Sequence, residues 1–310
     1  MKKIDVNFFP GWVRKSITFT IDDGNVRLDR KFLNITEPAG LKGTFNLNTP
    51  LKWLDAQGYR DLYRGYEITN HCKYHAYGFT DQTAREIKNE PFDRETADKN
   101  YIYPTAEEGI YRVYTYNWCY LATNEAYLEC TRRATEELEE VFGKGTIRDY
   151  VWPCGEQKND ELIAKLKAEG GFRSLRKTGC VKDSTGFALP QDRMAWSYNA
   201  NDSNMRELSK LYAEYPDDGE LKFFCFGVHS HDFENANDWD VLEDFCRDLG
   251  NRPESYWYAA VGEIFDYEDA VKALQITDRE IKNDSNVDLY VKIDGEPTVI
   301  AAHSVYALNA

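Results

Sequence analysis

Short apolar segments alternate with amphipathic segments along most of this chain, and that alternation limits the folds open to it. The strand-like segments are residues 16–21, 43–47, 66–69, 148–152, 193–198, 221–228 and 257–261. Helical patterns occupy residues 124–142, 160–168, 239–249 and 267–274. Strands that alternate with helices are typical of an α/β fold with a parallel sheet, either open or closed into a barrel.

Two regions depart from this alternation. Residues 91–118 are rich in Tyr and charged residues without clear periodicity, and we interpret them as an insertion. Near the C-terminus, residues 287–293 and 298–302 flank Asp294-Gly295, which is a hairpin signal. The sequence therefore predicts a main domain over residues 1–279 and a β-hairpin extension over residues 280–310. The hairpin could pack against the barrel, or its free strand edge could pair with a second subunit to form a homo-oligomer.

Charge and aromatic content narrow the classes of partner. The formal net charge is −15 over 310 residues. A protein that neutralises phosphates needs the opposite balance, so nucleic acid is not an expected partner, and neither is an anionic membrane surface. The aromatic fraction of 14% can supply a core. Aromatic rings also form the flat surfaces on which sugar rings stack.

The N-terminal residues and the cysteines bear on the cellular compartment. Asp5, Asn7 and Pro10 interrupt any apolar run behind the first lysines, so no signal peptide is visible. No segment approaches the length of a transmembrane helix. The seven cysteines are an odd number without a CxxC pair, which suits reduced thiols. These features predict a cytoplasmic protein.

Four of the five histidines form two tight groups. His71 and His75 have the spacing HxxxH, and the second group is His229-Ser230-His231. Each group directly follows a predicted strand, as Asp22-Asp23 and residues 152–155 also do. Parallel α/β folds build their sites at the carboxyl ends of strands, so we expect these groups to share one site.

Two histidines and one carboxylate are the ligand set of many catalytic zinc sites. An HxxxH spacing on a helical turn would place both imidazoles on one face, within reach of one ion. Asp22 or Asp23 could supply the carboxylate, and the other could act as a base. Each feature alone has a plainer interpretation, namely two surface histidines and an ordinary Asp-Asp-Gly turn.

Taken in order, these segments resemble the motifs of a known family. Residues 18–24 (TFTIDDG) and 67–75 (EITNHCKYH) are similar to the motifs T-F-D-D-G and H-[ST]-x-x-H of the polysaccharide deacetylase family, the NodB-homology domain of carbohydrate esterase family 4. Residues 151–155 fall where the third motif is expected. Residues 224–233 resemble the last motif, in which an apolar strand delivers a histidine. The resemblance covers about residues 16–275.

The resemblance implies a distorted (β/α) barrel with fewer than eight regular units. It also implies one divalent metal ion, usually zinc, held by Asp23, His71 and His75. Asp22 matches the family's catalytic base, which takes a proton from the attacking water. His229 matches the general acid, which protonates the departing nitrogen.

Further site residues follow from the third motif and its surroundings. The resemblance implies that the backbone N–H of Cys154 stabilises the oxyanion, and Trp152 and Trp196 are candidates for substrate contact. The chain departs from the family pattern at several points. Cys154 replaces an aromatic residue, and the fourth motif is poorly matched, with Trp196 or Asp202 as candidates for it. Val151 replaces the arginine that orients the catalytic aspartate, and Cys72 replaces a Ser or Thr, which weakens a supporting hydrogen bond.

The activity implied is removal of an acetyl group from the nitrogen of an amino sugar or glycan. Two alternatives stay open: hydrolysis of a C–N bond in a small non-sugar amide, and glycan binding without catalysis. The expected partner is thus a carbohydrate or a small molecule. His231 could tune His229, contact substrate or simply be exposed, and His303 is expected to be structural.

Overall fold

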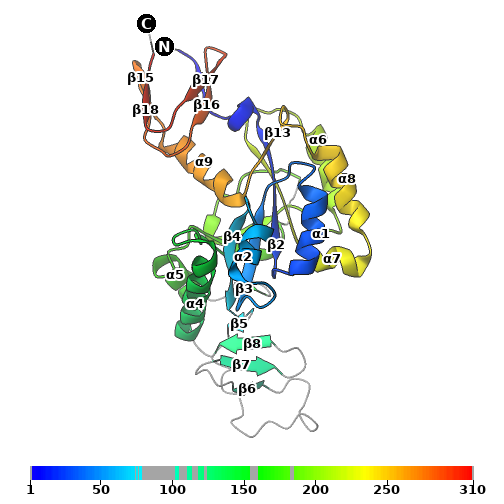
Figure 1. Cartoon of the computed structure of the whole chain (residues 1–310). Coiled ribbons are helices and arrows are strands. Elements are labelled where there is room, and N and C mark those ends of the chain that lie inside the picture. The colour runs from blue at the N-terminus through cyan, green and yellow to red at the C-terminus, as the bar shows by residue number, and fades with distance from the viewer. Residues whose placement is uncertain are drawn as a thin grey trace.

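The computed structural model describes residues 2–73, 75, 77–78, 102–104, 110–113, 118–121, 124–153, 160–181 and 185–308. Its centre is an eight-stranded sheet whose pairings are all parallel. The strands are β2 Lys15–Asp22, β3 Thr44–Thr49, β4 Glu67–Lys73, β9 Asp149–Val151, β10 Ser174–Cys180, β11 Trp196–Tyr198, β12 Lys222–His229 and β13 Tyr256–Tyr258. Their order is β11–β10–β9–β4–β3–β2–β12, and β13 pairs with the first half of β2 (Figure 1).

The sheet curls until its two ends meet. The backbone N–H of Asn199 donates to the carbonyl of Cys225 over 2.8 Å, and the N–H of Gly227 donates to the carbonyl of Ala200 over 2.8 Å. The residues that follow β11 are thereby bonded to β12. A Cβ atom at Gly227 would lie 2.2 Å from the Tyr198 ring, so glycine permits this close approach. The fold is a distorted (β/α) barrel with fewer than eight regular units, as the family resemblance implied.

Helices cover the outside of the barrel. In Figure 1, α1, α6, α7 and α8 lie on one flank, and α4 and α5 lie on the other. These helices bury one face each, as α8 does with Leu242, Phe245 and Leu249. The helices are α1 Val26–Thr36, α2 Ala56–Leu62, α4 Asn124–Phe142, α5 Asp160–Ala168, α6 Met205–Glu214, α7 Ser230–Ala236, α8 Trp239–Leu249 and α9 Val261–Ala273, with short 3-10 turns at η1 Pro10–Trp12 and η2 Arg193–Ala195.

A second sheet follows β4, in the region where the sequence suggested an insertion. Its strands are β5 Tyr77–Gly78, β6 Ile102–Pro104, β7 Ile110–Val113 and β8 Trp118–Leu121, in the order β5–β8–β7–β6. Figure 1 shows these strands beyond the carboxyl end of β4, apart from the barrel. The described part of the predicted insertion therefore contains strands of its own.

The C-terminal extension contains the predicted hairpin. Strands β16 Leu289–Ile293 and β17 Glu296–Ile300 pair across Asp294-Gly295, and β1 Ile4–Asp5 joins them by pairing with β16. A neighbouring sheet has the order β14–β15–β18, with strands at Gln275–Ile276, Glu280–Asn283 and Ser304–Ala307. Strands from before residue 280 therefore complete the extension, although a domain boundary at that position stays a prediction.

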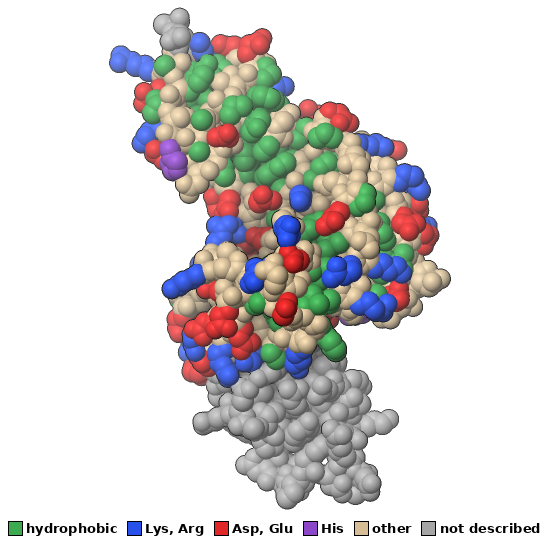
Figure 2. All heavy atoms as spheres, in the orientation of Figure 1, with side chains coloured by type: hydrophobic (Ala, Val, Ile, Leu, Met, Phe, Trp, Pro, Cys, Tyr) green, Lys and Arg blue, Asp and Glu red, His purple; other side chains and the backbone are tan. Residues whose placement is uncertain are grey.

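Apolar side chains gather on the surface of this extension (Figure 2). Ile276 is 46% exposed and Val305 is 55% exposed, which is unusual for such side chains. The formation of a homo-oligomer through this extension stays a prediction. Among the described residues, no helix combines the length and the apolar character that crossing a bilayer requires.

Three predicted helices match the structure, whereas helices α1, α2, α6 and α7 were not predicted. The helices expected at 124–142, 160–168 and 239–249 coincide with α4, α5 and α8. Strand β10 was not predicted, because its sequence SLRKTGC contains only one large aliphatic residue. Residues 193–195 form the turn η2 instead of the start of a strand, and α9 begins at Val261, six residues before its predicted start.

A largely buried ionic network closes the amino-terminal end of the barrel. The Glu67 carboxylate accepts hydrogen bonds from Thr44 Oγ1 (2.7 Å), the Gly262 N–H (2.9 Å) and Arg173 Nη2 (3.2 Å). Arg173 also donates to the carboxylate of Asp149. These bonds tie the first turn of α9 to the starts of β3, β4 and β9. Glu67 therefore has a structural role at the end of the barrel away from the histidines.

Glu67→Gln is expected to flatten the pH dependence of stability. Burial, and then the negative charge of Asp149, raise the pKa of Glu67 from 4.5 to about 7. A carboxyl group with a raised pKa in the folded chain stabilises the fold fully below pH 4.5, and this stabilisation is lost as the pH rises through about 7. Across this pH window, the free energy of unfolding should therefore change less in the variant than in the unsubstituted protein, by on the order of 2 kcal/mol. Urea titrations across this pH range measure the free energy of unfolding, and the exposed Glu296→Gln is the control. If the free energy of unfolding depends on pH equally in both variants, the prediction is wrong.

Candidate metal and catalytic site

The predicted site residues meet at the carboxyl end of the barrel. Asp22 is the last residue of β2, His71 lies near the end of β4, and His229 is the last residue of β12. Asp22 and His229 are directly paired in the parallel register of β2 and β12. Asp23 follows Asp22 in the turn after β2.

Asp23, His71 and His75 converge on one point. The Oδ1 atom of Asp23 lies 3.4 Å from His71 Nε2 and 3.3 Å from His75 Nε2. The two imidazole rings have their centroids 5.0 Å apart at an interplanar angle of 71°. His71 belongs to a strand and His75 to the turn after it, so the expectation that both lie on a helical turn is wrong. The two rings nevertheless lie close together.

Three residues of the site have a left-handed backbone conformation. Asp23, Cys72 and His75 have positive φ values of 77°, 62° and 50° although none is glycine. Such conformations cost on the order of 1–3 kcal/mol each and persist only where the surrounding structure enforces them. Two of these three residues, Asp23 and His75, are candidate metal ligands.

The donor atoms fit a divalent metal ion. Asp23 Oδ1 and His71 Nε2 are buried and have no hydrogen-bond partner among the described residues. His71 Nδ1 donates to the carbonyl of Val151 over 3.0 Å, which leaves the lone pair of Nε2 directed at Asp23. Burial, and then His71, lower the pKa of His75 to about 4, so its imidazole is neutral, as a metal ligand must be. In a tetrahedral zinc site with bonds of about 2.0–2.1 Å, two ligand atoms lie about 3.3–3.4 Å apart, which matches the observed separations.

Asp22 is held in a different way. Its side chain is buried, and its Oδ1 accepts hydrogen bonds from Asn46 Nδ2 (2.6 Å) and from Arg176 Nη2. Burial alone would raise the pKa of Asp22, but the charges of Arg176 and His229 outweigh it and lower that pKa. The carboxylate is therefore ionised at neutral pH and fixed beside Asp23.

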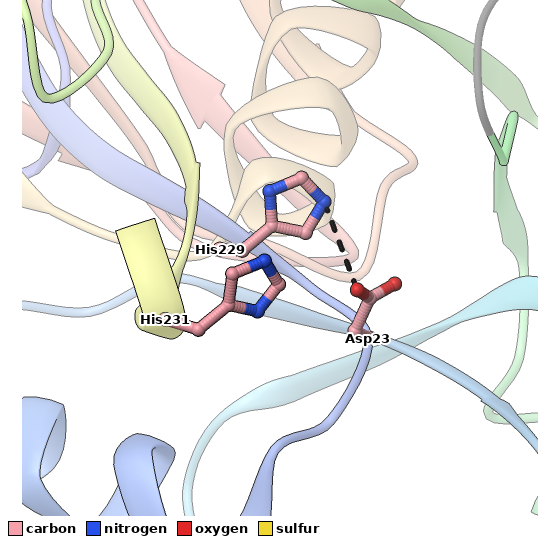
Figure 3. A group of neighbouring side chains, drawn as sticks. All are labelled: Asp23, His229 and His231. Atoms are coloured by element: carbon pink, nitrogen blue, oxygen red, sulfur yellow. Dashed lines mark ion pairs between the residues drawn. The ribbon is translucent and has the colours of Figure 1, made fainter. Parts of the chain in front are cut away.

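His229 faces Asp23 from the other side of the site. Its Nε2 atom lies 3.8 Å from Asp23 Oδ2 (Figure 3). Its Nδ1 atom lies 3.0 Å from Oδ2 of Asp232, which also accepts the backbone N–H of His229. Burial alone would lower the pKa of His229, but the hydrogen bond to Asp232 and the charges of Asp22 and Asp23 raise it to about 9. A protonated His229 can donate a proton at neutral pH.

A second group of possible ligands shares Asp23. It contains His229 and His231, whose rings stack with centroids 4.7 Å apart (Figure 3). We favour the group with His71 and His75 for a metal, because that group contains the buried atoms without partners. His229 instead has the partner and the raised pKa of a proton donor.

The remaining predicted residues are placed differently. Trp152 is 1% exposed and Trp196 is 4% exposed, and each ring packs in an apolar cluster. Neither indole offers a free face to a sugar, so the structure corrects the expectation that they contact substrate. Cys154 lies outside the described residues, and its oxyanion role stays a prediction.

Sequence reasoning missed three residues that orient the site. Arg176 takes the place of the arginine absent at Val151: the two residues are paired in register between β9 and β10, and Arg176 reaches Asp22 from the neighbouring strand. Asn46 holds the same carboxylate from β3, and Asp232 holds His229. Of these, only Asp232 had a sequence signal, since it follows three residues after His229.

The chain has distant structural likenesses. The Xyl-CE4 domain of a multidomain xylanase from the hindgut metagenome of Trinervitermes trinervoides is 13% identical, with a TM-score of 0.48, and the match covers 83% of this chain and 92% of that one. Bacillus subtilis PdaA, a family 4 carbohydrate esterase, is 14% identical with a TM-score of 0.46, over 85% and 86% of the two chains. The chitin deacetylase of Colletotrichum lindemuthianum is 14% identical with a TM-score of 0.43, over 80% and 85%. Likenesses this distant carry no argument about substrate.

Sequence similarity identifies the family of this chain. No curated protein shows significant sequence similarity to the chain. The family model described as polysaccharide deacetylase, however, matches residues 13–173, just over half of the 310 residues. The matched segment contains Asp22, Asp23, His71 and His75, whereas His229 lies beyond it and is placed by geometry. The chain therefore belongs to the polysaccharide deacetylase family.

Proposed function

We propose that this protein is a metal-dependent hydrolase that removes the N-acetyl group from an amino sugar or a glycan. One observation carries the proposal. The buried, unpartnered atoms Asp23 Oδ1 and His71 Nε2 converge with His75 Nε2 at separations of 3.3 and 3.4 Å, in a chain of the polysaccharide deacetylase family. Asp23, His71 and His75 would hold the cation, and zinc suits two imidazoles and a carboxylate.

The amide needs help at both ends, because its carbonyl is a poor electrophile and its amine a poor leaving group. A divalent cation in this site would polarise the carbonyl and lower the pKa of water. Arg176 and Asn46 both bind Oδ1 of Asp22, so Oδ2 is the oxygen that these two residues leave for the proton of the attacking water.

His229 supplies the second proton transfer. Its Nδ1 is held by Asp232, so its Nε2, which faces Asp23, is the atom that can reach the substrate. As the C–N bond breaks, Nε2 donates its proton to the departing nitrogen, while the water oxygen stays on the acetyl carbon. Acetate and a free amine are the products. The two proton-transfer groups thus flank the same carboxylate from different strands.

Acetate release from N-acetylated sugars tests the proposal. We expect N-acetylglucosamine or its short β-linked oligomers to release acetate and free amine in equal amounts. A chelator should abolish the release, and added zinc should restore it. Metal and sugar binding without acetate release would favour a glycan-binding protein. Hydrolysis confined to small non-sugar amides would favour the other alternative.

A further inference from the structure

A cavity of about 690 Å³ extends from the candidate metal site along helix α1. Asp23 and His231 line it at the end that belongs to the site, and Trp53 and Leu54 also contribute to its wall. Arg27 and Arg30, from the first two turns of α1, line it as well. A volume of this size suits a ligand larger than an acetamido group. The mechanism uses none of these residues except Asp23.

The two arginines make this wall cationic. Arg27 and Arg30 are three positions apart, so they project from neighbouring places on one helix face. Among the described residues, Arg30 has no ion pair. Arg27 has one long contact, in which its Nη1 lies 3.5 Å from Oε1 of Glu234. Glu234 is itself engaged by Lys31 Nζ at 2.9 Å and by Trp239 Nε1 at 2.8 Å. The positive end of the α1 dipole adds to the field.

This wall stands out against the charge of the whole molecule. The chain carries a net charge of −15, so exposed arginines directed into one cavity beside the site oppose the general field. Arg27 has a side chain that is 73% exposed and therefore available to a ligand. Guanidinium groups bind carboxylates and phosphates through two parallel hydrogen bonds. The cavity thus has the chemistry of an anion-binding subsite.

Trp53 supplies an apolar surface in the same cavity. Its side chain is 76% exposed, whereas Trp152 and Trp196 are in the core. An indole in this position offers a flat face to the C–H groups of a sugar ring. The cavity therefore joins an aromatic surface to a cationic wall, next to the carboxylate of Asp23.

We propose that this cavity binds an anionic substituent, a carboxylate or a phosphate, carried by the amino sugar whose amide lies at Asp23. The proposal rests on the proposed function and specifies its substrate class. Arg27 and Arg30 bind the anion, and Trp53 contacts the sugar ring. An acidic or phosphorylated N-acetyl sugar is then the preferred substrate over its neutral counterpart.

Binding of three matched ligands tests this inference. N-acetylglucosamine is neutral, N-acetylmuramic acid adds a carboxylate, and N-acetylglucosamine 1-phosphate adds a phosphate. By calorimetry, the zinc-loaded protein should bind one or both anionic ligands about 10- to 100-fold more tightly than the neutral one. The double variant Arg27→Gln/Arg30→Gln should lose this preference and bind the neutral sugar as before.

Two further variants sharpen the result. Arg279→Gln removes an exposed arginine beside the C-terminal extension and should leave all three affinities unchanged. Trp53→Ala should weaken all three ligands alike and keep their ratio. An anion preference that survives in the double variant would place the anion on the metal instead, and equal affinities in the unsubstituted protein would likewise overturn the inference. Acetate release, measured separately, tests the proposed function, so a failed subsite and a failed deacetylase are distinguishable.

Discussion

Asp22→Asn is expected to retain the bound cation and to lose turnover by about 10²–10⁴-fold. The asparagine amide has nearly the same shape as the carboxylate, but it cannot accept the proton of the attacking water. Among the described residues, Asp22 belongs to neither group of possible metal ligands, and its Oδ1 is bonded to Asn46 and Arg176. Turnover and metal binding should therefore separate in this variant.

Zinc content per chain and the rate of acetate release are the measurements. Asp240→Asn makes the same chemical change at an exposed carboxylate on α8 and should alter neither quantity. Thermal unfolding should accompany the assays, because the substitution also removes the charge partner of the buried Arg176. Near-normal turnover in a folded Asp22→Asn protein would show that another group accepts the proton.

Several elements of the α/β fold could be predicted from the sequence because their signals are local, whereas closure into a barrel was implied only by the family resemblance. Strand β12 is an almost uninterrupted apolar run, and α8 buries one face at helical spacing, so each segment specifies its own structure. Strand β10 has the sequence SLRKTGC, and its place in the sheet depends on pairing with β9 and β11. Such tertiary pairing overrides weak local propensity and leaves no pattern to find.

The residues of the site that follow strands could be predicted, because the carboxyl ends of parallel strands lie at one edge of the sheet. That rule places Asp23, His71 and His229 near one another without any knowledge of distances. It cannot predict Arg176, because the contact with Asp22 depends on the register that sets Arg176 beside Val151. Strand β9 has Val151 where the family has an arginine, and β10 supplies Arg176 instead. This replacement can be seen only when both strands are placed in the sheet.

The aromatic residues show a different limit. Trp152 was a candidate because it lies in the third motif, and Trp196 because it could belong to the fourth, yet both rings are in the core. Trp53 belongs to a loop without any motif, and it has the exposed ring. A tryptophan has the same propensities in either setting, so its exposure depends on the packing of its neighbours and not on its own segment.

His75→Ala is expected to remove the metal and, with it, the activity. His75 contributes one of the three converging donors. Without it, Asp23 and His71 are the two remaining protein ligands, whereas catalytic zinc sites use three. Loss of a group that merely supports a ligand costs about 10–100-fold in metal affinity. Loss of the ligand itself should therefore lower zinc affinity by more than about 100-fold.

His231→Ala is the matched control, and it decides between the two groups that share Asp23. If His71 and His75 hold the metal, zinc content after dialysis falls in His75→Ala and stays near one per chain in His231→Ala. The reverse outcome would assign the metal to His229 and His231, and His229 could then not act as the proton donor. His75 also occupies a strained turn with a φ of 50°, which a metal bond would help to hold. Unfolding of the His75→Ala protein should thus become insensitive to added zinc, whereas zinc should raise the melting temperature of His231→Ala as it does that of the unsubstituted protein.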